Sequence, residues 1–188
     1  GIEQLSVANA VNWDDAWANN QVHVISMEAL KDGWVRDVKS FDPPGPNDEG
    51  LMKGAHLQSS GILVKLSKRV TIKDCDLRNA QHRGGGGNGY LFEIRQSGQV
   101  VTTKSVAHAG RHNFIQNWGF GTSGCVWHKV TSTGGLAMLS SKSPIGTLGY
   151  SEFHHSLAMY NLVDASVISD GWASKNRGKF SSGAGHTA

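Results

Sequence analysis

The sequence predicts an all-β protein built from stacked repeats, and three observations carry this prediction. Glycine is abundant and proline is scarce, at 24 and 4 of 188 residues. No window of about ten residues combines the apolar pattern of an amphipathic helix with a helix cap. The nearest approach to a helical turn is DDAWANNQ at 14–21. Short runs of alternating or β-branched residues recur instead, separated by Gly, Asn, Asp and Ser.

One unit recurs along the chain: a short strand, a tight polar turn and a second strand. Three copies are HVISMEALKDGWVRDVKSF (23–41), SGILVKLSKRVTIKDCDL (60–77) and YLFEIRQSGQVVTTKSVA (90–107). Stacked units must keep their strands in register, whereas outward loops vary in length at small cost. We therefore expect about five stacked coils, each with two marker residues ten positions apart: Ile25 and Val35, Ile62 and Ile72, Phe92 and Thr102, Asn117 and Trp127, and Leu157 and Val167.

The columns of this alignment predict which side chains face the core. The residue two places after the first marker is apolar or Gly in every copy: Met27, Val64, Ile94, Gly119 and Met159. The residue between is mixed: Ser26, Leu63, Glu93, Trp118 and Ala158. Because successive side chains of a strand alternate between its faces, we expect the first column to be core and the second to point outward.

Two features carry a resemblance to a known family: the segment SKRVTIKDCDL (67–77) and the recurring strand–turn–strand unit with long loops. On these features the chain resembles the right-handed parallel β-helix proteins of the pectate-lyase-like superfamily over nearly its whole length. The resemblance implies one β-helix domain spanning 1–188, with about five coils and long loops. A β-sandwich is the rival, but its strand spacing of roughly 8–12 residues does not account for the long, variable gaps.

The two ends of the sequence suggest that the β-helix is truncated at one or both ends. The chain enters directly into the strand-like run IEQLSVANA (2–10) and finishes in the loop-like GKFSSGAGHTA (178–188). Open β-helix ends expose unpaired strand edges, which are normally covered. We therefore expect further domains or neighbouring chains to cover them.

Composition narrows the class of function. The net charge of +3 comes from scattered Lys and Arg, which does not indicate nucleic-acid binding. No apolar stretch approaches the roughly 20 residues of a membrane span. The only cysteines, Cys75 and Cys125, form no zinc-ligand spacing, and their redox state stays open. No Asp cluster indicates calcium, so we expect neither a metal site nor a cofactor, and a calcium requirement stays open.

Two further motifs have structural interpretations. GGGGNG (84–89) fits the letters of a dinucleotide fingerprint, but a strand follows it where a helix is required. We read it as a loop with residues at positive φ. His108 and His112 would share a face only on a helix, which Gly110 disfavours, so they do not predict a metal site.

A set of polar residues recurs near the start of the predicted first strands. The members are His23, His56, His82, His112 and His155, joined by Arg83 and Arg111. Successive coils rise about 4.8 Å, so residues at equivalent positions are within reach of one another. Three interpretations stay open for this edge: side chains that satisfy loop backbone groups, a catalytic or sugar-binding site, or, as the least favoured, a metal site from two or three of the His.

If the chain is an enzyme, the resemblance implies lyase-type β-elimination of an acidic polysaccharide. Such a reaction needs a cation for the uronate carboxylate and a base for the C5 proton. Arg111 or Arg95 fits the first role, His112 the second, and Glu93 is expected close to both. Trp118 is placed to stack on a sugar ring, and the other expected substrate contacts are Asn117, His82, Arg83 and His155.

Each of these residues also has a purely structural interpretation: Glu93 and Arg95 are then charges on a strand surface, and Trp118 is an aromatic side chain packed at a corner. The Trp-Ile-Asp-His-type motif of pectate lyases and the paired Asp of polygalacturonases are missing, and Asp14 and Asp15 lie outside the strand ladder. No catalytic residue is therefore carried over from the family. The sequence leads us to expect a secreted or cell-surface protein whose partner is a polysaccharide. A hydrolase and a non-catalytic binding, structural or adhesin-like module stay open as alternatives.

Overall fold

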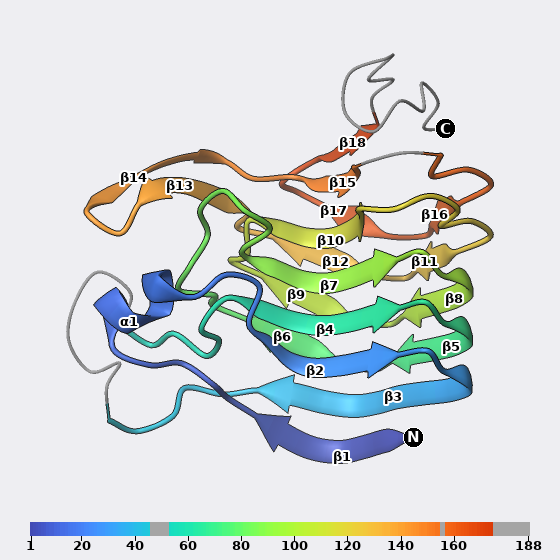
Figure 1. The fold of residues 1–188 in the computed structure, drawn as a ribbon, viewed down its shortest axis with the longest axis horizontal. Helices are drawn as coiled ribbons and strands as arrows, with labels where there is room; N and C mark the ends of the chain where they lie inside the picture. Colours follow the sequence, from blue (N-terminus) through green and yellow to red (C-terminus); the bar gives the residue numbers. More distant parts are fainter. Residues whose placement is uncertain (46–52, 155–156, 175–188) are drawn as a thin grey trace.

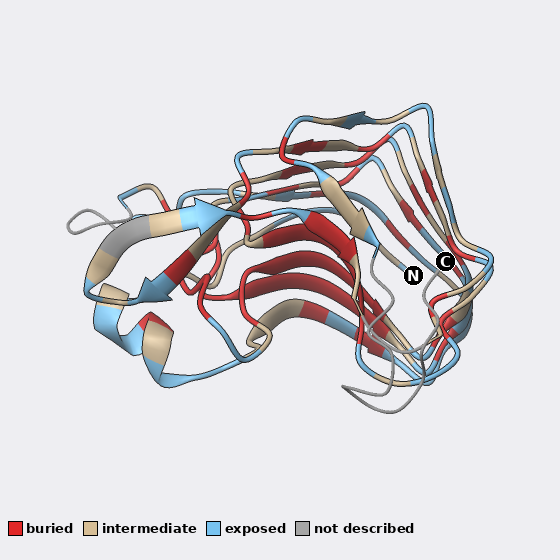
Figure 2. Ribbon diagram, turned by 90° about the horizontal axis from the view of Figure 1, so that it is seen from above, coloured by how far each residue is buried: buried red, intermediate tan, exposed pale blue. Residues whose placement is uncertain are grey.

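The computed structural model describes residues 1–45, 53–154 and 157–174. In this part of the chain the strands form a parallel β-helix with three faces, whose coils stack as in Figure 1 and surround one core when viewed along the stack in Figure 2. The expected all-β fold with parallel stacking is confirmed. Face 1 is a parallel sheet of six strands, listed from one end to the other: β2 (His23–Glu28), β4 (Ser60–Lys65), β7 (Tyr90–Arg95), β10 (His112–Asn117), β15 (Ser151–Phe153) and β18 (Trp172–Ser174).

Faces 2 and 3 share one larger parallel sheet because β3 (Lys31–Ser40) continues from one face to the other. Face 2 continues with β5 (Lys68–Lys73), β8 (Gly98–Thr103), β11 (Val126–His128) and β16 (Leu162–Asp164). Face 3 continues with β6 (Asp76–Arg78), β9 (Val106–His108), β12 (Thr131–Thr133) and β17 (Val167–Ile168). Strand β1 (Ile2–Val7) pairs with β3 at the first coil. Helix α1 (Trp13–Ala18) and the antiparallel hairpin of β13 (Leu136–Ser140) and β14 (Ser143–Leu148) lie where the face 1 strands begin (Figure 1).

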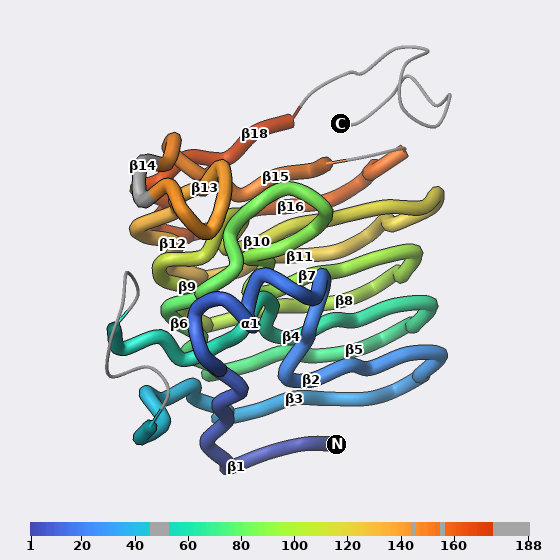
Figure 3. The backbone as a smooth tube through the Cα atoms, turned by 60° about the vertical axis from the view of Figure 1, so that its left-hand side comes forward, coloured from blue at the N-terminus to red at the C-terminus, as the bar shows by residue number. Residues whose placement is uncertain are grey.

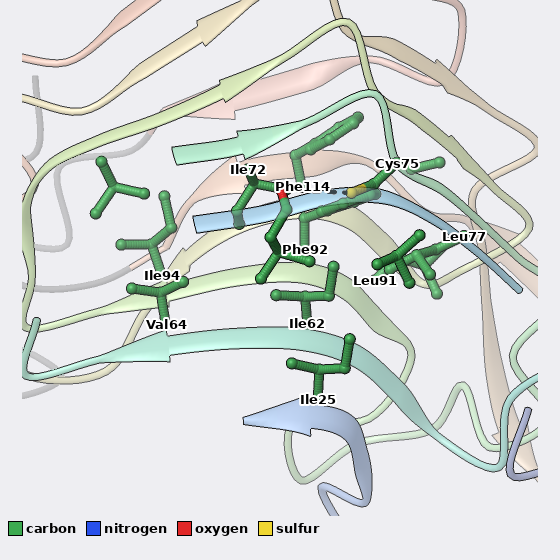
Figure 4. Close-up of a cluster of buried hydrophobic side chains, with 14 of the residues drawn as sticks. Ile25, Ile62, Val64, Ile72, Cys75, Leu77, Leu91, Phe92, Ile94 and Phe114 are labelled. Carbon is green, nitrogen blue, oxygen red and sulfur yellow. Dashed lines mark hydrogen bonds between the residues drawn. The ribbon is translucent and has the colours of Figure 1, made fainter. Parts of the chain in front are cut away.

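The core is a set of apolar ladders that run from coil to coil. On face 1, Ile25, Ile62, Phe92 and Phe114 occupy one register position in successive strands. All four are buried, and the rings of Phe92 and Phe114 stack with centroids 5.0 Å apart (Figure 4). Burying each such side chain contributes roughly 1.5–3 kcal/mol, so the stack of coils stabilises what one coil cannot.

The expected markers are correct in the first three coils and wrong in part beyond them. Phe114, not Asn117, pairs with Phe92, because the turn after β10 is longer and separates Phe114 from Trp127 by thirteen positions. In the fifth coil Glu152 pairs with Ile115, so Ser151 takes the place assigned to Leu157, which lies outside the strands. Val167 pairs with Thr131 on face 3, and Val163 holds the face 2 position.

The chain turns its corners at residues whose backbone φ lies in the left-handed region, and many of these residues are not glycine. Between faces 2 and 3 the same corner position has φ of 49–55° in every coil, filled by Asp37, Asp74, Lys104, Lys129 and Ala165. Side chains in this region cost about 1–2 kcal/mol each, so the paired strands on both sides must hold them there. This explains how the chain turns corners where the sequence gives no Gly signal.

The outward side of face 1 is covered, which the sequence did not reveal. Residues 8–22, here called the strap, include α1 and run across the outward side of face 1 before the chain enters β2 (Figure 3). The strap is bonded to the glycine-rich loop 84–89: Asn20 accepts from Asn88, and Gln21 donates to the carbonyl of Gly86. Gly86, Gly87 and Gly89 have positive φ, as expected.

The mixed column does face outward, but beyond Ser26 it is buried. Its true members are Ser26, Leu63, Glu93, Ile115 and Glu152, of which the last four are between 0 and 6 % exposed. Trp118 and Ala158 do not belong to it, because the longer turn after β10 shifts the register. From Leu63 onward the column is thus a buried layer of apolar and acidic side chains between the β-helix and the segments outside it.

Candidate functional site

A hollow of about 220 Å³ lies beside the starts of β10 and β15, on the outward side of face 1. The loop before β10, the β13–β14 hairpin and β15 supply its walls, which are lined by Arg111, His112, Ala137, Thr147, Leu148, Gly149, Tyr150, Glu152 and His154. Arg111 and His112 are held against the preceding coil, since their backbone N–H groups both donate to the carbonyl of Gly89, at 2.7 and 3.1 Å. The segment AGRHN is therefore a loop-to-strand corner that presents two polar side chains to one hollow.

His112 is a buried, neutral imidazole with one defined tautomer. Its Nδ1 lies 2.5 Å from the carbonyl oxygen of Tyr150, which can only accept, so Nδ1 carries the proton. Burial lowers the pKa of His112 to about 4, which keeps the ring neutral at physiological pH. Nε2 then holds a lone pair. The carboxylate of Glu152 lies 4.0 Å from Nε2, too far for a hydrogen bond.

Glu152 and His154 form a second pair in the same hollow. His154 Nδ1 lies 2.6 Å from a carboxylate oxygen of Glu152, and Glu152 is 3 % exposed. The rings of His154 and His112 have centroids 6.0 Å apart. Two imidazoles and one carboxylate thus converge on the hollow from adjacent coils.

Tyr90, from the preceding coil, and Arg111, from the loop before β10, lie beside His112. Tyr90 pairs with His112 in the β7–β10 register, and their ring centroids are 5.2 Å apart. Burial raises the pKa of Tyr90 to about 12, so its hydroxyl keeps its proton. The Arg111 guanidinium lies 5.7 Å from the Tyr90 ring and donates to the carbonyl of Gly84 at 2.5 Å. A cation, a neutral base and a protonated phenol therefore lie side by side.

Glu93 is the centre of a separate buried cluster on the same face. It is 0 % exposed and accepts hydrogen bonds from His23 Nε2 at 2.8 Å, from Asn117 Nδ2 at 2.7 Å and from Arg95 Nε. Arg95 also donates to Gln21 of the strap at 2.7 Å. Burial by itself would raise the pKa of Glu93, but the bonds from His23 and Arg95 outweigh it and lower that pKa. This carboxylate is ionised and fully engaged.

The other expected contact residues lie apart from the hollow. His82 stacks on Trp17 at 4.1 Å, accepts from the Gly84 N–H at Nδ1 and bonds Asn20 through Nε2, so it fastens the strap. Burial lowers the pKa of His82 to about 4. Arg83 is buried and donates to the carbonyl of Ala109 at 3.4 Å.

Trp118 and His155 complete the placement of the expected residues. Trp118 is 52 % exposed in the turn after β10, at the opposite end of that strand from His112. His155 lies outside the described residues. The structure therefore brings Arg111 and His112 together, groups Glu93 with Arg95 and Asn117, and places Trp118 at the far end of β10 from His112.

Three residues that line the hollow, Tyr150, Glu152 and His154, escaped the sequence reasoning, and so did Tyr90, which packs against His112. A signal for Tyr90 existed, because it stands two places before Phe92 just as His23 stands two places before Ile25. The others reach the hollow through the hairpin and the shifted register of the fifth coil, for which the sequence offered no marker.

Neither a metal cluster nor a membrane-spanning helix is found in the described ranges. No group of three or more His, Cys, Asp or Glu there has a metal-binding arrangement. None of the helices in those ranges is long and apolar enough to cross a bilayer. Cys75 and Cys125 are free and buried, and burial raises the pKa of both thiols.

Comparisons with known proteins give no match. No protein-family model matches the chain, and neither the curated proteins nor the solved structures include one with significant similarity to it. The fold assignment therefore rests on the strand register, and the chemistry on the geometry of the hollow.

Proposed function

We propose that this protein binds an acidic polysaccharide at the hollow around His112 and cleaves it there by β-elimination. The observation that carries the proposal is the neutral imidazole of His112, fixed as the Nδ1–H tautomer, with Arg111 beside it. The parallel β-helix architecture fits a relationship to the pectate-lyase-like superfamily, and with it a secreted or cell-surface location. Both belong to the proposal.

The reaction needs three roles, for which we assign Arg111 and His112 in the hollow and Tyr90 packed against His112. Arg111 pairs with the uronate carboxylate and withdraws charge from it, which acidifies the proton on C5. Nε2 of His112 removes that proton. As the C4–C5 double bond forms, the C4–O4 bond breaks, and the leaving oxygen takes a proton from the Tyr90 hydroxyl. The proton held on His112 then returns through solvent to the phenolate of Tyr90, which restores the starting state.

The first test is ultraviolet absorbance of the unsaturated product during incubation with alginate, pectate and glycosaminoglycans, each with and without calcium. Rising absorbance is expected with at least one of them. His112→Gln is expected to lower the rate by roughly 10²–10⁴-fold, because it removes the base. The matched control is His128→Gln on face 2, where the side chain is 35 % exposed, and it is expected to leave the rate unchanged. A flat trace over the whole panel with folded protein would overturn the lyase assignment.

The acid limb of the rate profile gives a second test. Because the pKa of His112 lies at about 4, the base stays deprotonated well below neutral pH. We expect kcat/KM to hold its plateau down to the region of pH 4 and to fall below it. A rate that is already lost near pH 6 would contradict His112 as the base.

Inverting hydrolysis is a second candidate, favoured by one observation. Glu93 and Glu152 stand in one outward column with Ile115 between them, so their backbones are about 9.6 Å apart, two coil rises of about 4.8 Å each. Inverting glycosidases separate their two carboxyl groups by roughly 6.5–9.5 Å. The lyase remains preferred because three donors already engage Glu93. New reducing ends without absorbance would favour the hydrolase.

A further inference from the structure

Asp170 is a buried carboxylate in the turn between β17 and β18, far along the chain from the residues that line the hollow. It is 3 % exposed and accepts three hydrogen bonds: from Asn113 Nδ2 at 2.8 Å, from Ser132 Oγ at 2.7 Å and from the Gly135 N–H at 2.9 Å. Burying a carboxylate costs free energy unless the group is well hydrogen-bonded, so we ask what these three hydrogen bonds hold in place.

One of these bonds leads to the loop that carries His112. Asn113 directly follows His112, is 1 % exposed, and accepts at Oδ1 from the Gly110 N–H at 3.0 Å. Its amide thereby closes the loop that contains Arg111 and His112. A Cβ at Gly110 would lie 2.8 Å from both Asn113 Oδ1 and the Gly89 carbonyl, so only glycine fits there.

A second bond leads to the carbonyl that sets the tautomer of His112. Gly135 donates to Asp170, and its own carbonyl accepts from the Gly149 N–H at 2.9 Å. Gly149 precedes Tyr150, whose carbonyl receives the Nδ1 proton of His112. A Cβ at Gly135 would lie 2.9 Å from Asp170 Oδ2 and 2.7 Å from the Gly149 carbonyl, so close approach is required here as well.

We infer that Asp170 is a positioning residue that fixes the orientation and tautomer of His112, because its hydrogen bonds hold both the loop 110–113 and the backbone that presents the Tyr150 carbonyl. Its catalytic consequence rests on the proposed lyase function, whereas its effect on the His112 ring does not. Asp170 itself is bonded to Asn113, Ser132 and Gly135, does not line the hollow and touches no reacting atom.

The test compares Asp170→Ala and Asp170→Asn with Asp164→Ala, a control in the same coil whose side chain is 55 % exposed. Nitrogen-edited NMR of the imidazole rings reads the tautomer, and His112→Gln assigns the signal. In Asp170→Ala we expect the Nε2–H form of His112 to appear and kcat to fall on the order of 10²-fold with little change in KM, as for a misplaced catalytic group. Asp170→Asn keeps one acceptor oxygen but loses the charge, and we expect a loss of roughly tenfold, about one unit of log rate.

Failure of this inference and failure of the lyase proposal are distinguishable. Unchanged His112 signals and kcat in both Asp170 variants would overturn the positioning role, as would a loss of activity with the His112 signals unchanged. If the Ala variant does not fold, an unchanged Asn variant overturns it alone. An inactive wild-type protein would refute the lyase, while the NMR comparison would still decide whether Asp170 sets the His112 tautomer.

Discussion

Replacing Glu93 by Gln is expected to destabilise the protein far more than a similar change at an exposed ion pair. Glu93 is completely buried and accepts from three donors, His23, Arg95 and Asn117. An amide keeps one acceptor oxygen but turns an N–H₂ group toward donors and leaves Arg95 without its counter-charge. Removing one partner of a buried pair costs about 3–5 kcal/mol, and the isosteric amide places the expected loss near the lower end, about 3 kcal/mol.

A matched control lies on the same sheet. Glu28 pairs with Lys65 at 2.7 Å, but these side chains are 47 and 31 % exposed. Exposed pairs contribute about 0.2–1 kcal/mol, so Glu28→Gln is expected to lower the free energy of unfolding by no more than that. Urea unfolding followed by tryptophan fluorescence measures both variants. Losses within about 1 kcal/mol of each other would refute the argument that the covered face makes Glu93 structurally essential.

The pH dependence of this difference has a defined sign. The folded pKa of Glu93 lies below its ordinary value of 4.5, so the unfolded chain takes up the proton first as the pH falls. The stabilisation by Glu93 is therefore fully present above pH 4.5 and is lost as the pH falls through the lowered folded pKa. The gap between wild type and Glu93→Gln should narrow below pH 4.5, and a gap that widens there would contradict the ionised carboxylate.

Three further predictions concern stability. The pKa of His112 is about 4 in the folded chain, against an ordinary value of 6.5. The free energy of unfolding of the wild type should therefore fall by up to about 3 kcal/mol as the pH drops from 6.5 to 4. In urea titrations His112→Gln should flatten this pH dependence. Phe114→Ala removes a fully buried, stacked ring and should cost about 3–5 kcal/mol, whereas Phe120→Ala, 53 % exposed, should stay within about 0.5 kcal/mol by the same assay. Ala165 has a φ of 49°, so Ala165→Gly should raise the melting temperature. Ala173→Gly in strand β18 should lower the melting temperature, because Gly in a strand costs about 0.5–1 kcal/mol of stability. Equal shifts in the two variants would argue against strain at the corner.

The early coils were predictable because local pattern and tertiary structure agree there. Ile25, Ile62 and Phe92 stand in strands whose turns have equal length, so alternation and spacing both identify the ladder. The prediction failed at Asn117 because it applied the ten-residue spacing of the first three coils, whereas the chain makes a longer turn after β10.

The candidate site was likewise predictable only where its residues are close together in the sequence. Arg111 and His112 are adjacent in the sequence, so their joint presence at one corner needed no long-range information. Glu152 and His154 join them only through the register of β15 against β10, and Tyr150 only through the hairpin that leads to it.

The sequence by itself determined the all-β class, the parallel stacking of repeats and the inner ladder residues of the first three coils, because period-two alternation and repeat spacing are properties of the local chain. Only the tertiary structure decided that the outward column of face 1 is buried, that Glu93 is engaged by three donors and that His112 is neutral with its proton on Nδ1. Those properties depend on the strap, the hairpin and the turn at Asp170, which meet face 1 from distant parts of the chain. Burial and pairing of a charge follow from such contacts and not from the residue that carries it.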